Sequence, residues 1–200
     1  INEETEEDIE AMAAILPSDK SYMHTGVFAT WKKRIPWLLL LMVSATFTGK
    51  IITYFEDALG AYVVLTAFIP MLMDTGGNAG SQSSVTIIRG ISMDEISFSD
   101  IFRVMWKEFR VSILCGFTLA IAGFIKVILI DHVEILVALV VSITLCVTVL
   151  IAKFIGCSLP ILVKKMGFDP AVMVSPFITT AVDAVSLLLY FNIASALLNI

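Results

Sequence analysis

Five long apolar stretches constrain the fold of this chain more than any other feature. A helix needs about 20 residues to cross roughly 30 Å of hydrocarbon. Stretches of that length fall at about 36–55, 59–88, 110–130, 133–155 and 170–198. Hydrophobic residues make up 58% of the chain and charged residues 16%, against roughly 45–50% and 25% in a soluble domain. We therefore predict an all-α polytopic membrane protein with five transmembrane helices.

The distribution of basic residues predicts the orientation of these helices. Loops on the cytoplasmic side of a membrane carry an excess of Lys and Arg. Basic residues cluster in 1–35, 89–110 and 156–169, whereas the loops near 56–58 and 131–132 are acidic. We expect a multi-pass protein of the plasma or inner membrane, with a cytoplasmic N-terminus and an outward C-terminus.

The first 20 residues differ in charge from the rest, with seven acidic residues and one base, Lys20. No basic stripe interleaved with aromatic residues occurs, so we expect no nucleic-acid partner. Cys115, Cys146 and Cys157 lie far apart in apolar runs, which excludes a disulfide framework or zinc motif. The chain begins at Ile1 without a signal peptide. We expect a fragment whose upstream part is missing.

An acidic residue inside the fifth stretch is the first candidate site. An ionised carboxylate in hydrocarbon costs at least about 2.5–3.5 kcal/mol, so Asp183 is a functional candidate by default. Ser175, Thr179 and Asp183 are spaced i, i+4, i+8 and share one helix face. Pro176 has no N–H to donate to the carbonyl of Val172, which leaves that oxygen as a further acceptor. These oxygens suit a hard cation, so Asp183, Thr179, Ser175 and Val172 are the predicted metal ligands.

A second polar group lies within the second stretch. Its members are Asp74, Gly76, Gly77, Asn78, Gly80 and Gln82. The carboxylate and the two amides fall at i, i+4, i+8, while the glycines allow another backbone or a hydrated ion to come close. Neither polar group contains His, Cys or Met, which disfavours Zn, Cu or Fe and favours Mg²⁺ or a similar ion. We predict that these residues and Pro176 line a pore or pack around it.

Simpler interpretations exist for both groups. The small-xxx-small spacing of Gly76 and Gly80 is more typical of helix packing than of ligand binding. Asp183 can instead be a structural acid paired with Lys50, Lys126 or Lys153. Lys153, near the inner end of its stretch, is expected to extend toward the membrane interface.

One motif resembles an enzyme signature. Asp74-Thr75-Gly76 matches the Asp-Thr-Gly of aspartic proteases. Those enzymes hold the motif in a β-rich lobe and need a second copy, whereas here it lies in an apolar helix. We therefore predict that the chain is not an enzyme.

The paired motifs resemble the membrane domain of the MgtE family of magnesium channels. They are Pro70, Thr75-Gly76-Gly77-Asn78-Ala79-Gly80-Ser81-Gln82-Ser83, Ile87-Ile88-Arg89, Asp169-Pro170-Ala171, Pro176 and Thr180-Ala181-Val182-Asp183. The resemblance implies a homodimer with one pore on its two-fold axis, lined by the second and fifth helices. It also implies that the carboxylate matching Asp183 binds hydrated Mg²⁺, the transported ion. Ser175 is a shorter hydrogen-bonding side chain than the asparagine often found there in that family.

The resemblance also implies a domain organisation. Residues 1–24 are similar to the end of a cytosolic connecting helix, which plugs the pore, and its linker, and 25–200 to the five-helix transmembrane domain. The upstream cytosolic regulatory domains of the family are absent from this chain. The implied partners are a second copy, the lipid bilayer and divalent cations.

The chemistry of Mg²⁺ agrees with this resemblance. Mg²⁺ releases its waters reluctantly, so two Asp183 carboxylates can hold the hydrated ion through water. A proton-coupled divalent-cation antiporter, with Asp183 as the exchange site, is the alternative function. A membrane scaffold is a third class, and it requires that Asp183 tolerate replacement by asparagine.

Overall fold

In a computed structural model of the chain, the described residues are 25–199, without the side chains of residues 58 and 171–176. These residues form helices and connecting turns, and the described part contains no strand. The expected all-α class is confirmed for that part. The predictions for residues 1–24 lie outside the described residues.

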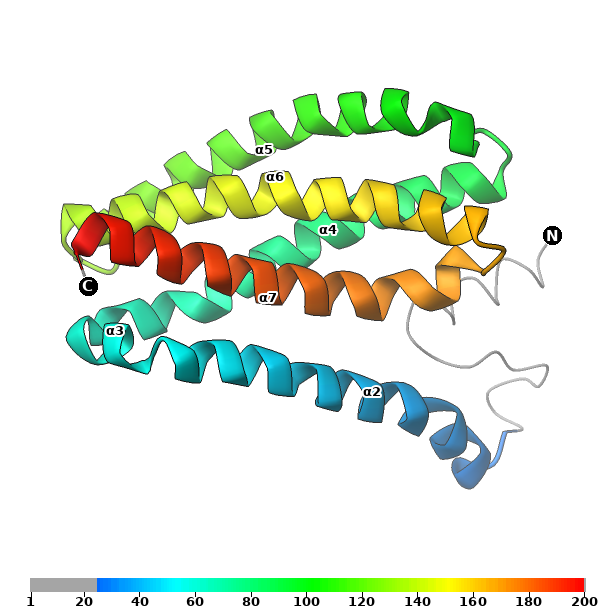
Figure 1. Cartoon of the computed structure of the whole chain (residues 1–200), viewed down its shortest axis with the longest axis horizontal. Coiled ribbons are helices and arrows are strands. Elements are labelled where there is room, and N and C mark those ends of the chain that lie inside the picture. Colours follow the sequence, from blue (N-terminus) through cyan, green and yellow to red (C-terminus); the bar gives the residue numbers. More distant parts are fainter. Residues whose placement is uncertain (1–24, 200) are drawn as a thin grey trace.

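Five long helices and three short ones make up the described part (Figure 1). The long helices are α2 (Val27–Tyr54), α4 (Ile69–Ser92), α5 (Ile101–Leu129), α6 (Ile135–Lys165) and α7 (Pro170–Leu198). The short ones are α3 (Glu56–Ala61), η2 (Val63–Phe68) and η3 (Phe98–Asp100). α7 covers the same range as the fifth apolar stretch, and it begins at a proline, whose fixed φ suits the first helical position.

The second apolar stretch is broken, although a continuous span over 59–88 was expected. The chain leaves helical geometry at Tyr62, where φ is −132° and ψ is 73°. α4 then starts with Pro70 in its first turn, where the missing N–H has no intrahelical partner to lose. As a result, α4 carries the whole second polar group and ends one turn beyond the expected span.

Three other helices are longer than the expected spans. α2 begins at Val27, nine residues before the expected start. α5 begins at Ile101, also nine residues early, so residues 101 to 109 are its first turns. α6 continues to Lys165, ten residues past the expected end, and includes Pro160. The extension of α5 brings Glu108 against Ser83 of α4 and Lys153 of α6.

α6 is the central helix of the bundle. It packs against α4, α5 and α7, while α2 packs mainly on α7 and contains no buried residue. One end of the bundle holds the start of α2, the ends of α4 and α6 and the starts of α5 and α7 (Figure 1). The opposite end holds α3, η2, the α5–α6 connection and the end of α7.

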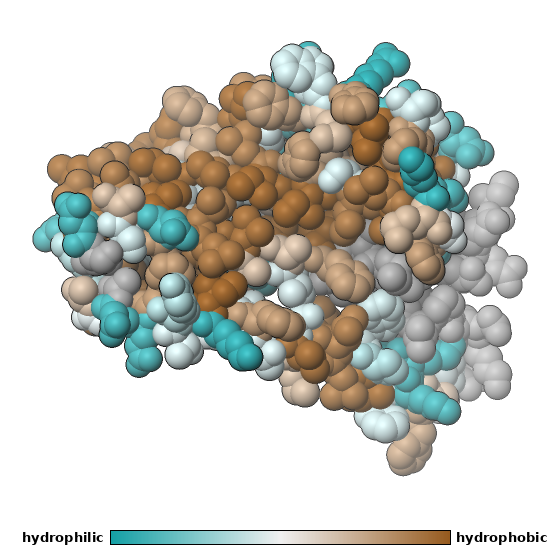
Figure 2. Space-filling view, viewed as in Figure 1, coloured by the Kyte–Doolittle hydropathy of each residue, from teal (hydrophilic) through white to brown (hydrophobic). Residues whose placement is uncertain are grey.

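Four helical segments are long and apolar enough to cross a membrane among the residues described. They are Val27–Tyr54, Phe98–Leu129, Ile135–Lys165 and Phe177–Leu198. α4 is not among them, because its glycines, serines and amides lower its hydropathy. Figure 2 shows a broad hydrophobic band with hydrophilic residues gathered toward the two ends of the molecule. The exposed apolar surface of that band fits a lipid environment.

Candidate functional site

The polar stripe of α4 is exposed on the surface of the chain. Asp74, Asn78 and Gln82 are all exposed, whereas the glycines between them are buried. α4 therefore turns its small residues inward and its carboxylate and amides outward. Hydrocarbon cannot solvate such groups, so this stripe needs water or another polypeptide against it.

The buried glycines allow α4 to lie very close to α6 and α7. A Cβ atom on Gly76 would lie 2.7 Å from Thr148 Cγ2 and 2.9 Å from Val182 Cγ1. A Cβ on Gly80 would lie 2.8 Å from Ile178 Cγ2. For these two glycines the structure therefore shows helix packing, the interpretation that their spacing favours.

Gly77 differs from its neighbours because it faces the candidate ion ligands. A Cβ atom placed there would lie 4.0 Å from Asp183 Oδ1 and 3.9 Å from Thr179 Cγ2. The polar residues of α4 and α7, about 100 positions apart in sequence, thus meet at one level of the bundle. The Asp183 side chain is half-buried, and Asp74 lies one turn before Gly77 on α4.

The lysines considered as partners of Asp183 have other partners or lie in a pocket. Lys126 Nζ is 2.7 Å from Asp131 Oδ2. Lys153 is buried, and its Nζ lies 3.9 Å from Glu108 Oε2 and donates to Ser83 Oγ at 3.3 Å. The expectation that Lys153 extends to the interface is therefore wrong. Among the described residues, the two ion pairs leave Asp183 without a lysine partner.

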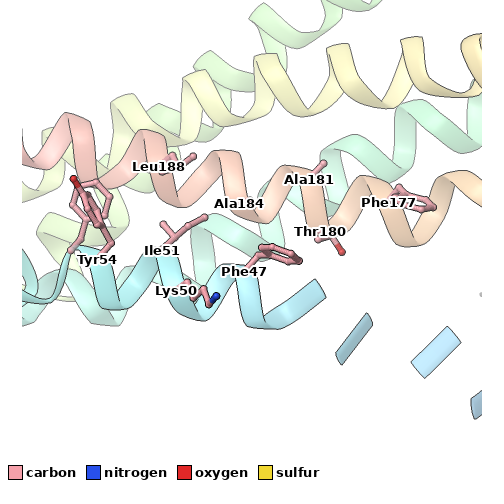
Figure 3. Close-up of a pocket in the computed structure, with 10 residues that line it drawn as sticks. Phe47, Lys50, Ile51, Tyr54, Phe177, Thr180, Ala181, Ala184 and Leu188 are labelled. Atoms are coloured by element: carbon pink, nitrogen blue, oxygen red, sulfur yellow. The ribbon is translucent and has the colours of Figure 1, made fainter. Parts of the chain in front are cut away.

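Lys50 lies in a fissure between α2 and α7. The fissure has a volume of about 630 Å³. It is lined by Phe47, Lys50, Ile51, Tyr54, Phe55, Phe177, Thr180, Ala181, Ala184 and Leu188. Figure 3 shows Lys50 reaching from α2 on the side of the fissure opposite Thr180 and Ala184 of α7. This fissure is separate from the contact between Gly77 and Asp183.

The described residues contain no cluster of three or more His, Cys, Asp or Glu side chains suited to a metal ion. One chain thus offers Asp183 and Asp74 together with hydroxyl and amide oxygens, which can hold a cation through its water molecules. The side chains of Val172, Ser175 and Pro176 lie outside the described part, so the predictions for them stay predictions.

The structure adds residues that sequence reasoning missed. Ser83 donates to Glu108 Oε2 at 2.6 Å, which joins α4, α5 and α6 through Lys153. Gly156 of α6 packs on the carbonyl of Gly80, and any Cβ at that position would overlap it. One sequence signal was available, because Glu108, Ser112 and Gly116 share a helix face of small and polar residues.

Among the described residues, the chain is an all-helical membrane protein in which the Asp183 carboxylate lies beside Gly77 of a neighbouring helix, next to the exposed polar stripe of α4. An acidic residue in this position is typical of integral membrane transport proteins. The family model described as "MgtE: Divalent cation transporter" matches residues 69–193. The chain belongs to this family, whose members are transporters and not enzymes.

Three curated relatives share this similarity. Each carries the name magnesium transporter MgtE. The protein of Bacillus subtilis is 39% identical over 197 residues, that of Thermus thermophilus 35% over 196 and that of Enterococcus faecalis 30% over 195. The matches cover 98% of this chain but only 42–43% of the relatives, so the chain spans less than half of their length.

Proposed function

We propose that this chain is the membrane part of a Mg²⁺ transporter that moves the hydrated ion past Asp183. The observation that supports this most directly is the position of Gly77 beside Asp183 and Thr179, which joins the polar residues of α4 and α7. The relatives' names supply the identity of the ion. Mg²⁺ keeps several waters, so the site needs oxygen acceptors around a water shell and no tight cage of side chains.

Each residue of the proposed site would have a different role in binding the hydrated ion. Asp183 supplies the charge that attracts the dication, and Thr179 lies beside it as a further oxygen. Ser175 and the carbonyl of Val172, about two and three turns from Asp183 on α7, would accept hydrogen bonds from the ion's water. The absence of a Cβ at Gly77 leaves room for that water next to the Asp183 carboxylate.

A second copy of the chain would complete the pore on a two-fold axis. The exposed stripe of Asp74, Asn78 and Gln82 supports this, because a single copy leaves it against hydrocarbon. Placing two α4 and two α7 helices around the axis gives the ion two Asp183 carboxylates. All five long helices then cross the membrane, with α4 shielded from lipid by its neighbours.

The dimer can be tested by cross-linking. In a background with Cys115, Cys146 and Cys157 replaced by serine, we expect Asn78→Cys to link two chains through a short bifunctional maleimide. The control is Phe117→Cys, which lies on the exposed, lipid-facing side of α5. Equal yields for the two variants, read as dimer bands on a denaturing gel, would contradict the proposed axis.

The orientation follows from the charged ends of the bundle. Arg89, Arg103, Lys107 and Lys165 all lie at the end where α4 and α6 stop and α5 starts. The positive-inside rule places this end in the cytoplasm and the end of α7 outside. The matches cover 43% of the two first relatives, which supports further domains in the whole protein, and we propose that these lie upstream and are cytosolic and regulatory.

Substitution of Gly77 tests the space beside Asp183. We expect Gly77→Ala to keep Mg²⁺ uptake within about twofold, because its Cβ makes only ordinary contacts near 4 Å. Gly77→Val adds two methyl groups beside the carboxylate and should lower uptake about tenfold or more. Gly49→Val is the control, since nothing lies within 4 Å of a Cβ there. Uptake is measured in proteoliposomes with a Mg²⁺-sensitive dye, and full activity of Gly77→Val would contradict the role.

A further inference from the structure

A polar pocket of about 400 Å³ lies where α4 ends and α5 begins. The loop between these helices forms one wall and folds back onto α4. The N–H groups of Glu95 and Ile96 both donate to the carbonyl of Gly90, at 2.8 and 3.0 Å. Ile96 covers Gly90 so closely that a Cβ there would lie 2.5 Å from its Cδ1 atom. The pocket therefore has walls fixed by backbone hydrogen bonds and packing.

Three basic side chains line this pocket from two helices. Arg89 comes from the last turn of α4, and Arg103 and Lys107 come from the first turns of α5. All three are exposed. The two ion pairs found among the described residues involve other bases. The charged groups of all three bases lie at the pocket, where Arg103 shares the lining with Asp100.

Three carboxylates also line the pocket, and two of them already accept hydrogen bonds. Asp100 accepts from the N–H of Ser97 at 3.0 Å and from its hydroxyl at 2.7 Å. Glu108 accepts from Ser83 and faces Lys153, which adds a fourth positive charge behind the pocket. The third carboxylate, Glu95, lies on the loop. The lining thus holds three bases and three carboxylates, and with Lys153 behind it the positive charges exceed the negative ones by one.

Aromatic side chains mark the depth of this pocket in the membrane. Phe98, Phe102 and Trp106, at the start of α5, are 41%, 81% and 58% exposed. Exposed tryptophan is typical of the membrane–water interface, where lipid headgroups lie, and Trp106 is such a residue beside Lys107. The pocket therefore opens at the level of phosphate groups and not in solution far from the membrane.

We propose that this pocket binds the phosphate group of an anionic phospholipid, with Arg89, Arg103 and Lys107 as its ligands. Arginine forks bind phosphate oxygens through two N–H groups, and lysine adds a point charge. Basic pockets between membrane helices on the cytoplasmic side suit anionic headgroups, and the proposed orientation places this one there. The lipid would join the end of α4 to the start of α5. Lipid binding does not depend on which ion the protein transports.

The test measures the lipid that the full chain retains. The protein is reconstituted with equal amounts of phosphatidylglycerol and phosphatidylcholine, extracted in mild detergent and analysed by mass spectrometry. We expect phosphatidylglycerol to be enriched on the wild type. Arg103→Gln/Lys107→Gln should bind it about 25-fold more weakly, from roughly fivefold for each base removed near a membrane surface. The matched control, Lys32→Gln/Arg34→Gln, removes two exposed bases from α2 and should keep the enrichment.

Three results would overturn the proposal. They are unchanged enrichment in Arg103→Gln/Lys107→Gln, an equal loss in the α2 control, and displacement of the lipid by inorganic phosphate at matched concentration. The last result would assign the pocket to free phosphate. Arg89→Gln provides a second variant on another helix if the double variant does not fold. A monodisperse elution profile is required for each variant before its lipid is counted.

Discussion

Asp183→Asn is expected to reduce saturable Mg²⁺ uptake roughly 100-fold or more while the protein still inserts and folds. A carboxylate about 5 Å from a dication contributes several kcal/mol at an effective dielectric constant of about 20. The variant removes that attraction but keeps the shape of the side chain. Gly77 and Thr179 stay in place, so the loss is assigned to charge. Uptake is measured in proteoliposomes with a Mg²⁺-sensitive dye at a series of Mg²⁺ concentrations.

The matched control for this prediction is Asp131→Asn. Asp131 lies in the connection between α5 and α6 and pairs with the partly exposed Lys126. Removal of this acid should leave uptake within about twofold, because such a pair contributes about 1 kcal/mol or less. Near wild-type uptake in Asp183→Asn would contradict the site. Uptake that requires an imposed proton gradient would instead favour a coupled carrier over a channel.

The sequence predicts which residues of a helix share a face, but not which faces meet. The spacing of Asp74, Asn78 and Gln82 predicts one stripe, and that of Thr179 and Asp183 predicts another. The contact of Gly77 with Asp183 is set by the packing of α4 against α7, which depends on Gly76, Gly80 and Gly156 and on α6, which packs against both helices. No local pattern encodes that pairing.

The helix boundaries, like the contacts between helix faces, were only partly predictable from the sequence. The start of α7 was predictable, because Pro170 follows Asp169, a typical N-cap residue, and its fixed φ suits the first helical position. The break before α4 was not, because Tyr62 to Phe68 is an apolar run with no strong breaker before Pro70. Tyr190 contributes to this geometry by donating its hydroxyl to the carbonyl of Leu65 at 2.9 Å. That bond joins residues 125 positions apart.

The charges inside the bundle were the least predictable part. Glu108 lies outside the five expected spans, and Lys153 was expected to extend toward the membrane interface. Continuous α5 instead brings the carboxylate against α4 and α6, where Ser83 and Lys153 reach it. Burial of a charge is favourable only when its partners are present, so the pair is visible only in three dimensions.

Lys153→Met is expected to be the most destabilising single substitution in this polar cluster. It leaves the Glu108 carboxylate in the bundle with Ser83 as its remaining hydrogen-bond partner. Removal of one partner of a buried ion pair costs about 3–5 kcal/mol. We expect a large drop in the apparent melting temperature of the protein in detergent. It is measured as the temperature at which heating abolishes the monodisperse elution peak.

A second substitution should largely reverse this loss. Lys153→Met/Glu108→Gln removes both charges, and a neutral pair of similar volume is often as stable as the buried ion pair. Lys126→Met is the matched control, because its pair with Asp131 has side chains 42% and 25% exposed and contributes about 1 kcal/mol or less. If Lys153→Met has the same apparent melting temperature as the Lys126→Met control, the cluster of Ser83, Glu108 and Lys153 does not hold α4, α5 and α6 together. If the double variant is less stable than the single one, the cost comes from lost packing of the lysine stem and not from the unpaired carboxylate.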